Sequence, residues 1–331
     1  MRNRGRSRQP ALTGAIVTGR HILWPGNLAR RISPSGLNRQ PPLGRLGNLE
    51  VRLANSAAEI RRAQKLRYQV FFEEMSARGG GQTHRARRDA DSFDRICDHL
   101  LVLDHAASDH SLLGRRPKLV GTYRMLRDDV ARLNRGFYTA GEFDIAPLID
   151  RKPSLKFLEL GRSCVLAPYR SKRTVELLWH GAWWYVCAHD IGVMIGCASL
   201  EGTDPDRLAL QLSFLHHNAR APEEWRVQAH DRYYVEMNRM PASAIDKGRA
   251  LRALPPLIKG YLRLGAFVGS GAVIDREFGT TDVCIVLPVA AICPRYVEHF
   301  GPDASRYAAG TPVSCAPPRS ARLMRMKRSS L

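Results

Sequence analysis

Phe157-Leu158-Glu159-Leu160-Gly161-Arg162-Ser163-Cys164-Val165-Leu166 is the stretch that decides the fold. It is a largely apolar, strand-like run that carries a glutamate and an arginine three residues apart. A basic segment from Ala167 to Thr174 follows at once, and Val175 to Val186 then repeats apolar residues at helical spacing. The first turn of a helix has unpaired N–H groups and the positive end of the helix dipole. The sequence therefore predicts a strand, a turn and a helix start that together suit a phosphate.

Polar residues in this stretch are the first candidates for chemistry. Glu159 stands near the C-terminal end of the predicted strand, where a carboxylate beside a phosphate-binding helix is placed to accept a proton. The alternative is an ion pair between Glu159 and Arg162 at the surface, which would contribute little. The predicted phosphate contacts come from the turn and the helix start, at Arg170, Ser171, Lys172, Arg173 and Thr174.

The net charge of +20 is concentrated at the two ends of the chain. Residues 1–45 contain nine arginines and residues 304–331 contain six basic residues, with no acidic residue in either segment. The part between them carries only +5, which argues against a folded domain specific for nucleic acid. Basic tails suit a loose contact with anionic lipid or nucleic acid, and the alternative is that they are disordered and solvated.

Several common classes of site and segment are not supported. The seven cysteines include no Cys-x-x-Cys pair, which argues against a zinc module, and we expect no metal. There is no Gly-x-Gly-x-x-Gly fingerprint after a first strand and no Gly-Lys-Ser/Thr loop. The longest uncharged apolar run, residues 283–293, is too short to cross a bilayer, so we expect a cytoplasmic protein that contacts the inner face of the membrane at most peripherally.

The order of predicted elements indicates the fold. Ser56 begins a capping box and a helix, a polar loop follows at 76–98, and strands are expected at 99–103 and 119–126. After the strand and helix of the opening stretch, further elements are expected as strands at 193–200, 232–237 and 282–287 and as helices at 205–215 and, interrupted by two prolines, 251–264. This order predicts an α/β (α+β) fold, with a mixed twisted sheet flanked by helices on both faces. The expected organisation is a disordered basic extension at 1–47, one domain at 48–302 and a basic tail at 303–331.

This arrangement resembles the GNAT acyltransferase fold. The closest branches are the ornithine N-acyltransferases that begin ornithine lipid synthesis and the acyl-homoserine-lactone synthases, and later segments at 253–266 and 296–301 resemble the ornithine branch in particular. The resemblance spans about residues 49–301. It is carried by Arg67-Tyr68-Gln69-Val70-Phe71, Asp91 with Asp94, Asp98-His99-Leu100-Leu101-Val102, Gly121-Thr122-Tyr123-Arg124 and Leu158-Glu159-Leu160-Gly161-Arg162.

The resemblance implies transfer of a 3-hydroxyacyl group from acyl carrier protein to the α-amine of L-ornithine, which forms lyso-ornithine lipid. The donor is then a thioester on a 4′-phosphopantetheine arm, and no tightly bound cofactor is expected. Members that use acetyl-CoA carry glycines in the phosphate turn, but the corresponding positions here are Arg173 and Val175. A single phosphate suits this turn better than a diphosphate. Because carrier proteins are acidic, the basic turn is also suited to attract one.

The same resemblance assigns roles to individual residues. Glu159 is the expected general base, and a backbone N–H near Cys164 or Val165 is the expected donor to the oxyanion. Asp91, Asp94 and Arg67 are expected to form a polar network that orders the loop or holds the acceptor. Arg124 and Arg162 are expected to fix this network or to bind a carboxylate. The alternative for these charged residues is a purely structural cluster of ion pairs.

Three other functions remain open at this point. Lactone synthesis from adenosylmethionine would use the same fold. His84 with Asp89 and His99 with Asp104 match the His-x₄-Asp pattern of glycerolipid O-acyltransferases, although their surroundings do not fit that motif. A non-catalytic, basic membrane- or nucleic-acid-binding protein is the third alternative.

Overall fold

The computed structural model describes residues 41–75, 77–78, 81–111, 114–293, 296, 299 and 307. The predicted extension up to residue 40 and nearly all of the predicted tail lie outside these residues. The first strand is at Gly44–Leu46, so the folded part begins before the predicted boundary at residue 48. Tyr307, within the predicted tail, is buried, and its ring stacks on that of His180 with centroids 4.0 Å apart. In the described part of the chain, no helix is long and apolar enough to span a membrane.

A mixed sheet forms the centre of the fold. Its strands follow the order β1-β2-β3-β4-β6-β7-β10-β9-β8-β5. β6 pairs with β7 in parallel, whereas β4 on one side and β10 on the other are antiparallel to their neighbours. The strands are β1 Gly44–Leu46, β2 Leu49–Leu53, β3 Asp98–Ser111, β4 Gly114–Arg127, β5 Phe143–Asp144, β6 Phe157–Val165, β7 Val193–Glu201, β8 Gln228–Ala229, β9 Phe267–Asp275 and β10 Thr280–Pro288.

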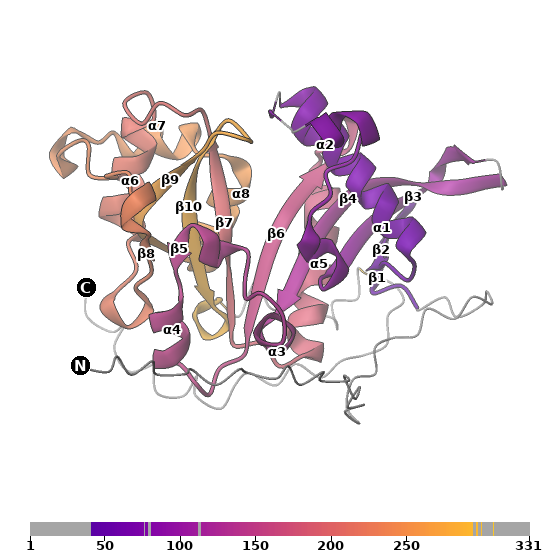
Figure 1. Cartoon of the computed structure of the whole chain (residues 1–331), viewed down its shortest axis with the longest axis horizontal. Helices are drawn as coiled ribbons and strands as arrows, with labels where there is room; N and C mark the ends of the chain where they lie inside the picture. Colours follow the sequence, from indigo (N-terminus) through magenta and orange to yellow (C-terminus); the bar gives the residue numbers. More distant parts are fainter. Residues whose placement is uncertain are drawn as a thin grey trace, which may run out of the picture. The chain divides into compact units, whose positions relative to one another are not determined.

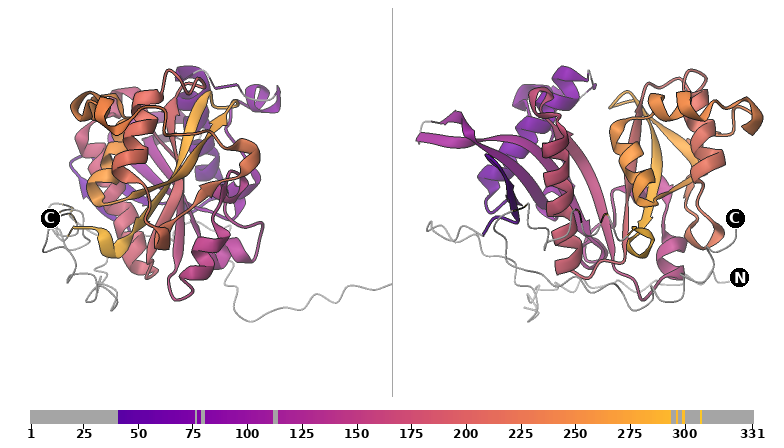
Figure 2. Two further views of the ribbon diagram at one scale, coloured as in Figure 1. Left: turned by 90° about the vertical axis from the view of Figure 1, so that its left-hand side faces the viewer. Right: turned by 180° about the vertical axis from the view of Figure 1, so that it is seen from behind.

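Helices cover both faces of the sheet, as expected (Figure 1). One large apolar cluster joins α5, α6, α7 and α8 to one face, which is turned toward the viewer in the right-hand view of Figure 2. Two further clusters pack α1, α3 and α4 on the opposite face. The helices are α1 Ala57–Tyr68, α2 Gly81–Ala86, α3 Asp128–Arg132, α4 Ala146–Arg151, α5 Lys172–Ala188, α6 Ala209–Ala219, α7 Lys247–Ala253 and α8 Pro256–Leu264.

The two parallel strands β6 and β7 separate partway along their length. They pair at three positions, ending at Glu159 opposite Ile195, and then diverge toward the top of Figure 1. Gly196 is the next residue of β7, and a Cβ atom there would lie 2.3 Å from the carbonyl oxygen of Leu160. A glycine is therefore required where the two backbones are last in contact. The opening places Glu159 at the point where the sheet divides.

Most local predictions are confirmed, but the loop predicted at 76–98 contains the helix α2 and a 3₁₀ turn, Ser92–Arg95, and two further predictions are wrong. Ser56 caps α1 and accepts a hydrogen bond from the Glu59 N–H, and the two prolines at 255–256 separate α7 from α8. The helix predicted at 205–215 begins only at Ala209, because the Asp204 carboxylate accepts from the Asp206 N–H and holds a turn there. The strand predicted at 232–237 is a 3₁₀ turn, Asp231–Tyr233, and one isolated bridge at Val235.

Candidate functional site

Glu159 lies on β6 at the last position that pairs with β7 and is only 5% exposed. Its two carboxylate oxygens accept hydrogen bonds from the backbone N–H groups of Tyr138 and Thr139, at 2.9 and 2.6 Å. These residues begin the 3₁₀ turn Thr139–Gly141, so the carboxylate holds this turn against the opening between the strands. Glu159 does not form an ion pair with Arg162, which lies near Asp89 and Asp91 instead, so the alternative of a surface pair between them is wrong.

Arg162 occupies a bulge in β6. The register between β4 and β6 shifts here, because β6 has one more residue than β4 between the paired positions on either side. Its backbone is left-handed, with φ of 52°, a conformation that costs energy for any residue except glycine and is concentrated at functional sites. The guanidinium lies between the rings of Tyr138 and Phe278, 4.9 and 4.6 Å from their centroids. The bulge therefore directs the arginine toward the turn that Glu159 holds.

Arg67 of α1 is completely buried among carboxylates. Its guanidinium donates to Asp89 at 2.8 Å and to the two oxygens of Asp94 at 2.9 and 2.8 Å. Gln64, one turn earlier on α1, also donates to Asp94 at 2.9 Å. Burial alone would raise the pKa of Asp94, but the hydrogen bonds and charge of Arg67, with the charge of Arg124, hold that pKa well below its usual range.

Two further arginines complete this network. Arg124 of β4 donates to both oxygens of Asp91, at 2.6 and 2.7 Å, and to Asp94 at 3.2 Å. Arg162 lies 3.3 Å from the carboxylate of Asp89 and 3.6 Å from that of Asp91. The structure thus brings together the five predicted network residues and one that was not predicted as a site residue. We call this set the arginine–aspartate network: Arg67, Arg124, Arg162, Asp89, Asp91 and Asp94.

The residues that match the His-x₄-Asp pattern contact other partners in the structure. The His84 ring contacts the Tyr68 hydroxyl at 3.1 Å, while Asp89 binds Arg67. The His99 ring contacts the carbonyl oxygen of Asp94 at 3.0 Å, and Asp104 accepts from the Tyr169 hydroxyl at 2.9 Å. Each histidine and aspartate of the two motifs is thus held by other partners.

Three carboxylates that the sequence did not single out lie together on the same face of the sheet as Glu159. Glu142, Asp275 and Asp282, which we call the acidic trio, place oxygen atoms within 4.8 Å of one another. Cys197 of β7 connects them to the turn held by Glu159, because its thiol donates to Glu142 at 3.3 Å and lies 3.8 Å from the Thr139 hydroxyl. Oxygen atoms at this spacing suit a hard cation or an ammonium group.

Crowding of these carboxylates changes their acidity. Burial, together with the negative charge of Asp282, raises the pKa of Glu142 to about 7. Burial raises the pKa of Asp282 to about 6, against hydrogen bonds from Ser199 and Thr280 that lower it. At neutral pH the acidic trio is therefore partly protonated when no cation is bound.

This crowding predicts how stability depends on pH. Because the pKa of Glu142 in the folded chain, about 7, lies above its reference value of 4.5, its contribution is fully present below pH 4.5 and is lost as the pH rises through 7. At 1.36 kcal/mol per pKa unit, the free energy of unfolding should fall by roughly 3 kcal/mol over this window through Glu142. Glu142→Gln should remove most of this fall, as measured by urea unfolding at pH 5 and pH 8.

The exposed Glu224 provides the control for this measurement. Glu224→Gln should leave the pH dependence of unfolding as it is in the wild type. An E142Q variant whose unfolding free energy falls as steeply with pH as that of the wild type would show that Glu142 is not destabilised by its neighbours.

The basic turn before α5 is present, but its cations already contact carboxylates or carbonyl oxygens of the chain. Arg170 donates to the carbonyl oxygen of Val165 at 3.0 Å and pairs with Glu74. Lys172 is 86% exposed and lies 3.6 Å from Glu176, and Arg173 donates to the carbonyl oxygen of Leu46 at 3.4 Å. Ser171 caps α5 by accepting from the N–H of Thr174, which is buried. Lys172 and Arg173 are thus the cations best placed at this helix start.

The two predicted oxyanion positions lie just after the bulge. Cys164 is buried between α1 and the sheet, where burial raises the pKa of its thiol, so its side chain is not a nucleophile. Cys164 pairs with Thr122, and Val165 pairs with Gly121. The irregular backbone of β6 is thus centred on Arg162 and Ser163, one or two residues before the predicted donors.

The chain matches a known family over the part that carries these residues. Residues 66–180 match the family described as an acetyltransferase (GNAT) domain. This segment includes the arginine–aspartate network, Glu159, the bulge and the start of α5.

Comparison with individual proteins extends this match to most of the chain. The chain resembles the acyl-homoserine-lactone synthase LasI, with 10% identity and a TM-score of 0.35 over 73% of this chain and 90% of that one. An L-ornithine N(alpha)-acyltransferase of Rhizobium meliloti (strain 1021) is 55% identical over 272 residues, which are 82% of this chain and 90% of that protein. One of Agrobacterium fabrum (strain C58 / ATCC 33970) is 53% identical over 80% of this chain and 88% of its own length. The chain therefore belongs to the L-ornithine N(alpha)-acyltransferase family and is an acyltransferase.

Proposed function

We propose that the chain transfers a 3-hydroxyacyl group from the phosphopantetheine thioester of acyl carrier protein to the α-amine of L-ornithine. The products are lyso-ornithine lipid, which contains a new amide bond, and the free thiol of the carrier protein. The observation that carries this proposal is the 55% identity to a protein with this acceptor in its name, over 82% of the chain. The position of Glu159 where β6 and β7 separate supports it.

Glu159 is the proposed general base. The α-ammonium of ornithine must lose a proton before its nitrogen can attack the thioester carbon. Both oxygens of Glu159 already accept a backbone hydrogen bond, and each retains a lone pair that can accept a proton through a bridging water. The α-ammonium gives one proton to the carboxylate, and the C–N bond forms. As the tetrahedral intermediate collapses, the C–S bond breaks, the second proton lost from the nitrogen passes to the thiolate, and Glu159 releases its proton to solvent.

Backbone N–H groups near the bulge in β6 are the proposed donors to the oxyanion of the tetrahedral intermediate. The bulge at Arg162 and Ser163 interrupts the ladder to β4, and interrupted ladders free N–H groups for other partners. Cys164 and Val165 follow within two residues. A donor at this place would lie on the same strand as Glu159, three or more residues further along it.

The acidic trio is the proposed partner of the second amine of ornithine. A free δ-ammonium group carries one positive charge, and the trio offers three carboxylates on the face where Glu159 lies. Binding of the ammonium would favour the ionised forms of Glu142 and Asp282. The arginine–aspartate network would hold the turn at 138–141 in place through Arg162, which lies on the Tyr138 ring.

The phosphate of the pantetheine arm is proposed to bind at the start of α5. Ser171, Lys172, Arg173 and Thr174 lie there, and Lys172 and Arg173 are exposed. Arg170 would orient the turn through its pair with Glu74 rather than contact the phosphate directly. Outside the described residues, the basic tails are proposed to contact an anionic membrane surface, so that a cytoplasmic enzyme is held near its lipid product.

Lipid analysis of a bacterium that lacks ornithine lipids and expresses this chain tests the proposal. We expect a new ornithine-containing lyso-lipid, and we expect none from cells that express Glu159→Gln at the same level. Folded protein without a new lipid, in cells with active carrier protein, would contradict the proposed function. An acyl-homoserine lactone in the medium would instead identify the alternative reaction.

A further inference from the structure

A basic groove lies on the outer side of α7 and α8, on the arm of the sheet that ends in β9 and β8. It has a volume of about 450 Å³. Leu251 at its rim is 42% exposed. The residues that line it are Leu251, Arg252, Lys259, Leu262 and Arg263. A concave apolar floor between cations suits a protruding, acidic protein segment.

The charges of this surface have no ion-pair partner within the described residues, although Lys259 lies 3.5 Å from the carbonyl oxygen of Arg252. Between Asp246 and Leu264 there are five basic residues and one acidic residue, Asp246, whose carboxylate caps α7 by accepting from the Arg249 N–H. In the part of the chain that the structure describes, no carboxylate lies within ion-pair distance of the five cations. By contrast, Arg170 and Lys172 at the start of α5 each have a glutamate partner. The five cations are Lys247, Arg249, Arg252, Lys259 and Arg263.

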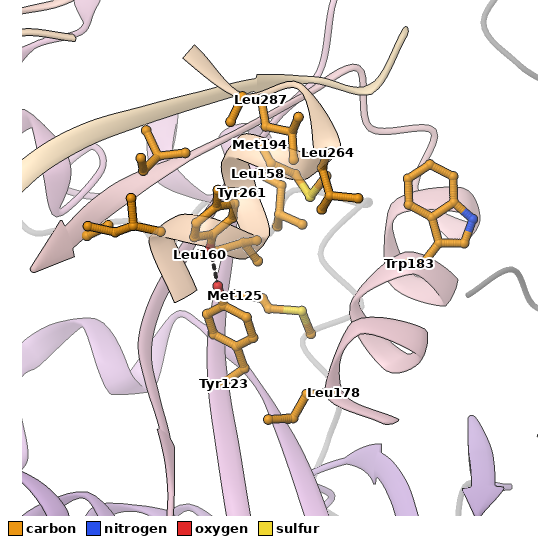
Figure 3. Packing of buried hydrophobic residues seen from close by; sticks show 14 of the residues in the cluster. Tyr123, Met125, Leu158, Leu160, Leu178, Trp183, Met194, Tyr261, Leu264 and Leu287 are labelled. Carbon is orange, nitrogen blue, oxygen red and sulfur yellow. Dashed lines mark hydrogen bonds between the residues drawn. The ribbon is translucent and has the colours of Figure 1, made fainter. Parts of the chain in front are cut away.

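The inner side of α8 reaches β4, which is the neighbour of β6 in the sheet. The hydroxyl of Tyr261 forms a hydrogen bond with that of Tyr123 in β4 (Figure 3). The Tyr261 ring also packs against that of Trp179 of α5, with centroids 5.4 Å apart. α8 and α5 therefore cover the same face of the sheet. This is the face opposite Glu159 and the acidic trio, because Tyr123 and Arg124 point to opposite sides of β4.

We propose that the basic groove of α7 and α8 is the docking surface for the acidic carrier protein that delivers the acyl thioester. This inference rests on the proposed function. A carrier protein bound here would be on the face of the sheet that α5 covers. Its phosphopantetheine arm would then reach the opening between β6 and β7 from the face opposite the acceptor. Acidic side chains of the carrier would pair with Arg252, Lys259 and Arg263, and an apolar side chain would enter between Leu251 and Leu262.

A membrane surface fits this groove less well than a protein does. Helices that lie on lipid project a stripe of large apolar side chains outward, whereas here two leucines, of which Leu251 is 42% exposed, line a hollow together with three cations. Lipid binding is one of the outcomes that the experiment distinguishes.

Charge reversal at the exposed rim tests the proposal. The double variant Arg252→Glu/Arg263→Glu should raise KM for 3-hydroxyacyl carrier protein by about tenfold or more, because like charges then face each other. Its kcat, and its rate with the same acyl group on pantetheine alone, should equal those of the wild type. The KM of the wild type should rise with salt, and that of the variant should depend on salt much less.

Matched charge reversal on the other arm of the sheet is the control. Arg61 on α1 and Arg115 on β4 are exposed, and Arg61→Glu/Arg115→Glu should leave KM for the carrier protein unchanged. An unchanged KM in the R252E/R263E variant overturns the docking proposal, as does an equal loss with acyl-pantetheine. Lost binding to vesicles of anionic phospholipid with an unchanged KM would assign the groove to a membrane. If the wild type forms no acylornithine from the carrier-bound donor, the proposed function itself fails.

Discussion

Replacing Glu159 by glutamine should lower kcat for amide formation by about 10²–10⁴-fold, the usual effect of removing a general base. The amide cannot take the proton from the α-ammonium of ornithine. Its NH₂ group would also face one of the two backbone N–H groups, of Tyr138 and Thr139, that the carboxylate now binds. Steady-state rates with carrier-bound donor across pH 7 to 9.5 measure the effect.

The pH dependence separates a base from a residue that only positions the turn. If Glu159 removes the proton, the deficit of Glu159→Gln should shrink as rising pH deprotonates the amine in solution. A deficit that stays constant with pH would assign Glu159 a positioning role. Glu50→Gln, at a buried glutamate of β2 that pairs with Arg45, is the control and should stay within about threefold of the wild-type rate.

Arg67→Met should lower the free energy of unfolding by about 3–5 kcal/mol, because it leaves buried carboxylates without their partner. The Arg67 side chain is 0% exposed and donates to both Asp89 and Asp94. Methionine has a similar length, so lost packing contributes little. Urea unfolding at pH 7 measures the change.

Arg87→Met is the matched control, because its ion pair with Glu73 is at the surface and its side chain is 71% exposed. We expect a loss of about 1 kcal/mol or less for that pair. If Arg67→Met cost no more than Arg87→Met, the arginine–aspartate network would not hold the fold together. Lowering the pH below the reference value of 3.8 for Asp94 should weaken the wild type as well, because the pKa of this carboxylate is depressed in the folded chain and its stabilisation is lost as it is protonated.

Sequence patterns predicted correctly those helices and strands whose formation depends on neighbouring residues alone. The strand at β6, the helix at α5 and the break between α7 and α8 each depend on neighbouring residues. The strand expected at 232–237 failed for a reason that involves β9. Gly271 there has φ of 78°, and the ring of Tyr234 occupies the space where a Cβ atom at residue 271 would be. No pattern within 232–237 could reveal this contact.

In the candidate site, too, the residues within local motifs were predicted and those that meet only through the fold were not. The motif at 158–162 and the pair Asp91 and Asp94 pointed to residues that the fold does bring together. Asp89 was named only in the His-x₄-Asp match and was not predicted to join the network, because its contact with Arg67 depends on how the loop before η2, Ser92–Arg95, folds back on α1. Asp275 and Asp282 lie on the neighbouring strands β9 and β10, but Glu142, beside β5, is more than 130 residues earlier in the chain, so the three carboxylates come together only in the folded sheet.

The reaction of the purified chain with 3-hydroxyacyl carrier protein and L-ornithine tests the central claim most directly. We expect one free carrier-protein thiol for each molecule of acylornithine, with fragment masses that place the acyl group on the α-nitrogen. The E159Q variant should give the same product at a rate about 10²–10⁴-fold lower. Folded wild-type protein that forms no amide, or that acylates the δ-nitrogen, would contradict the account.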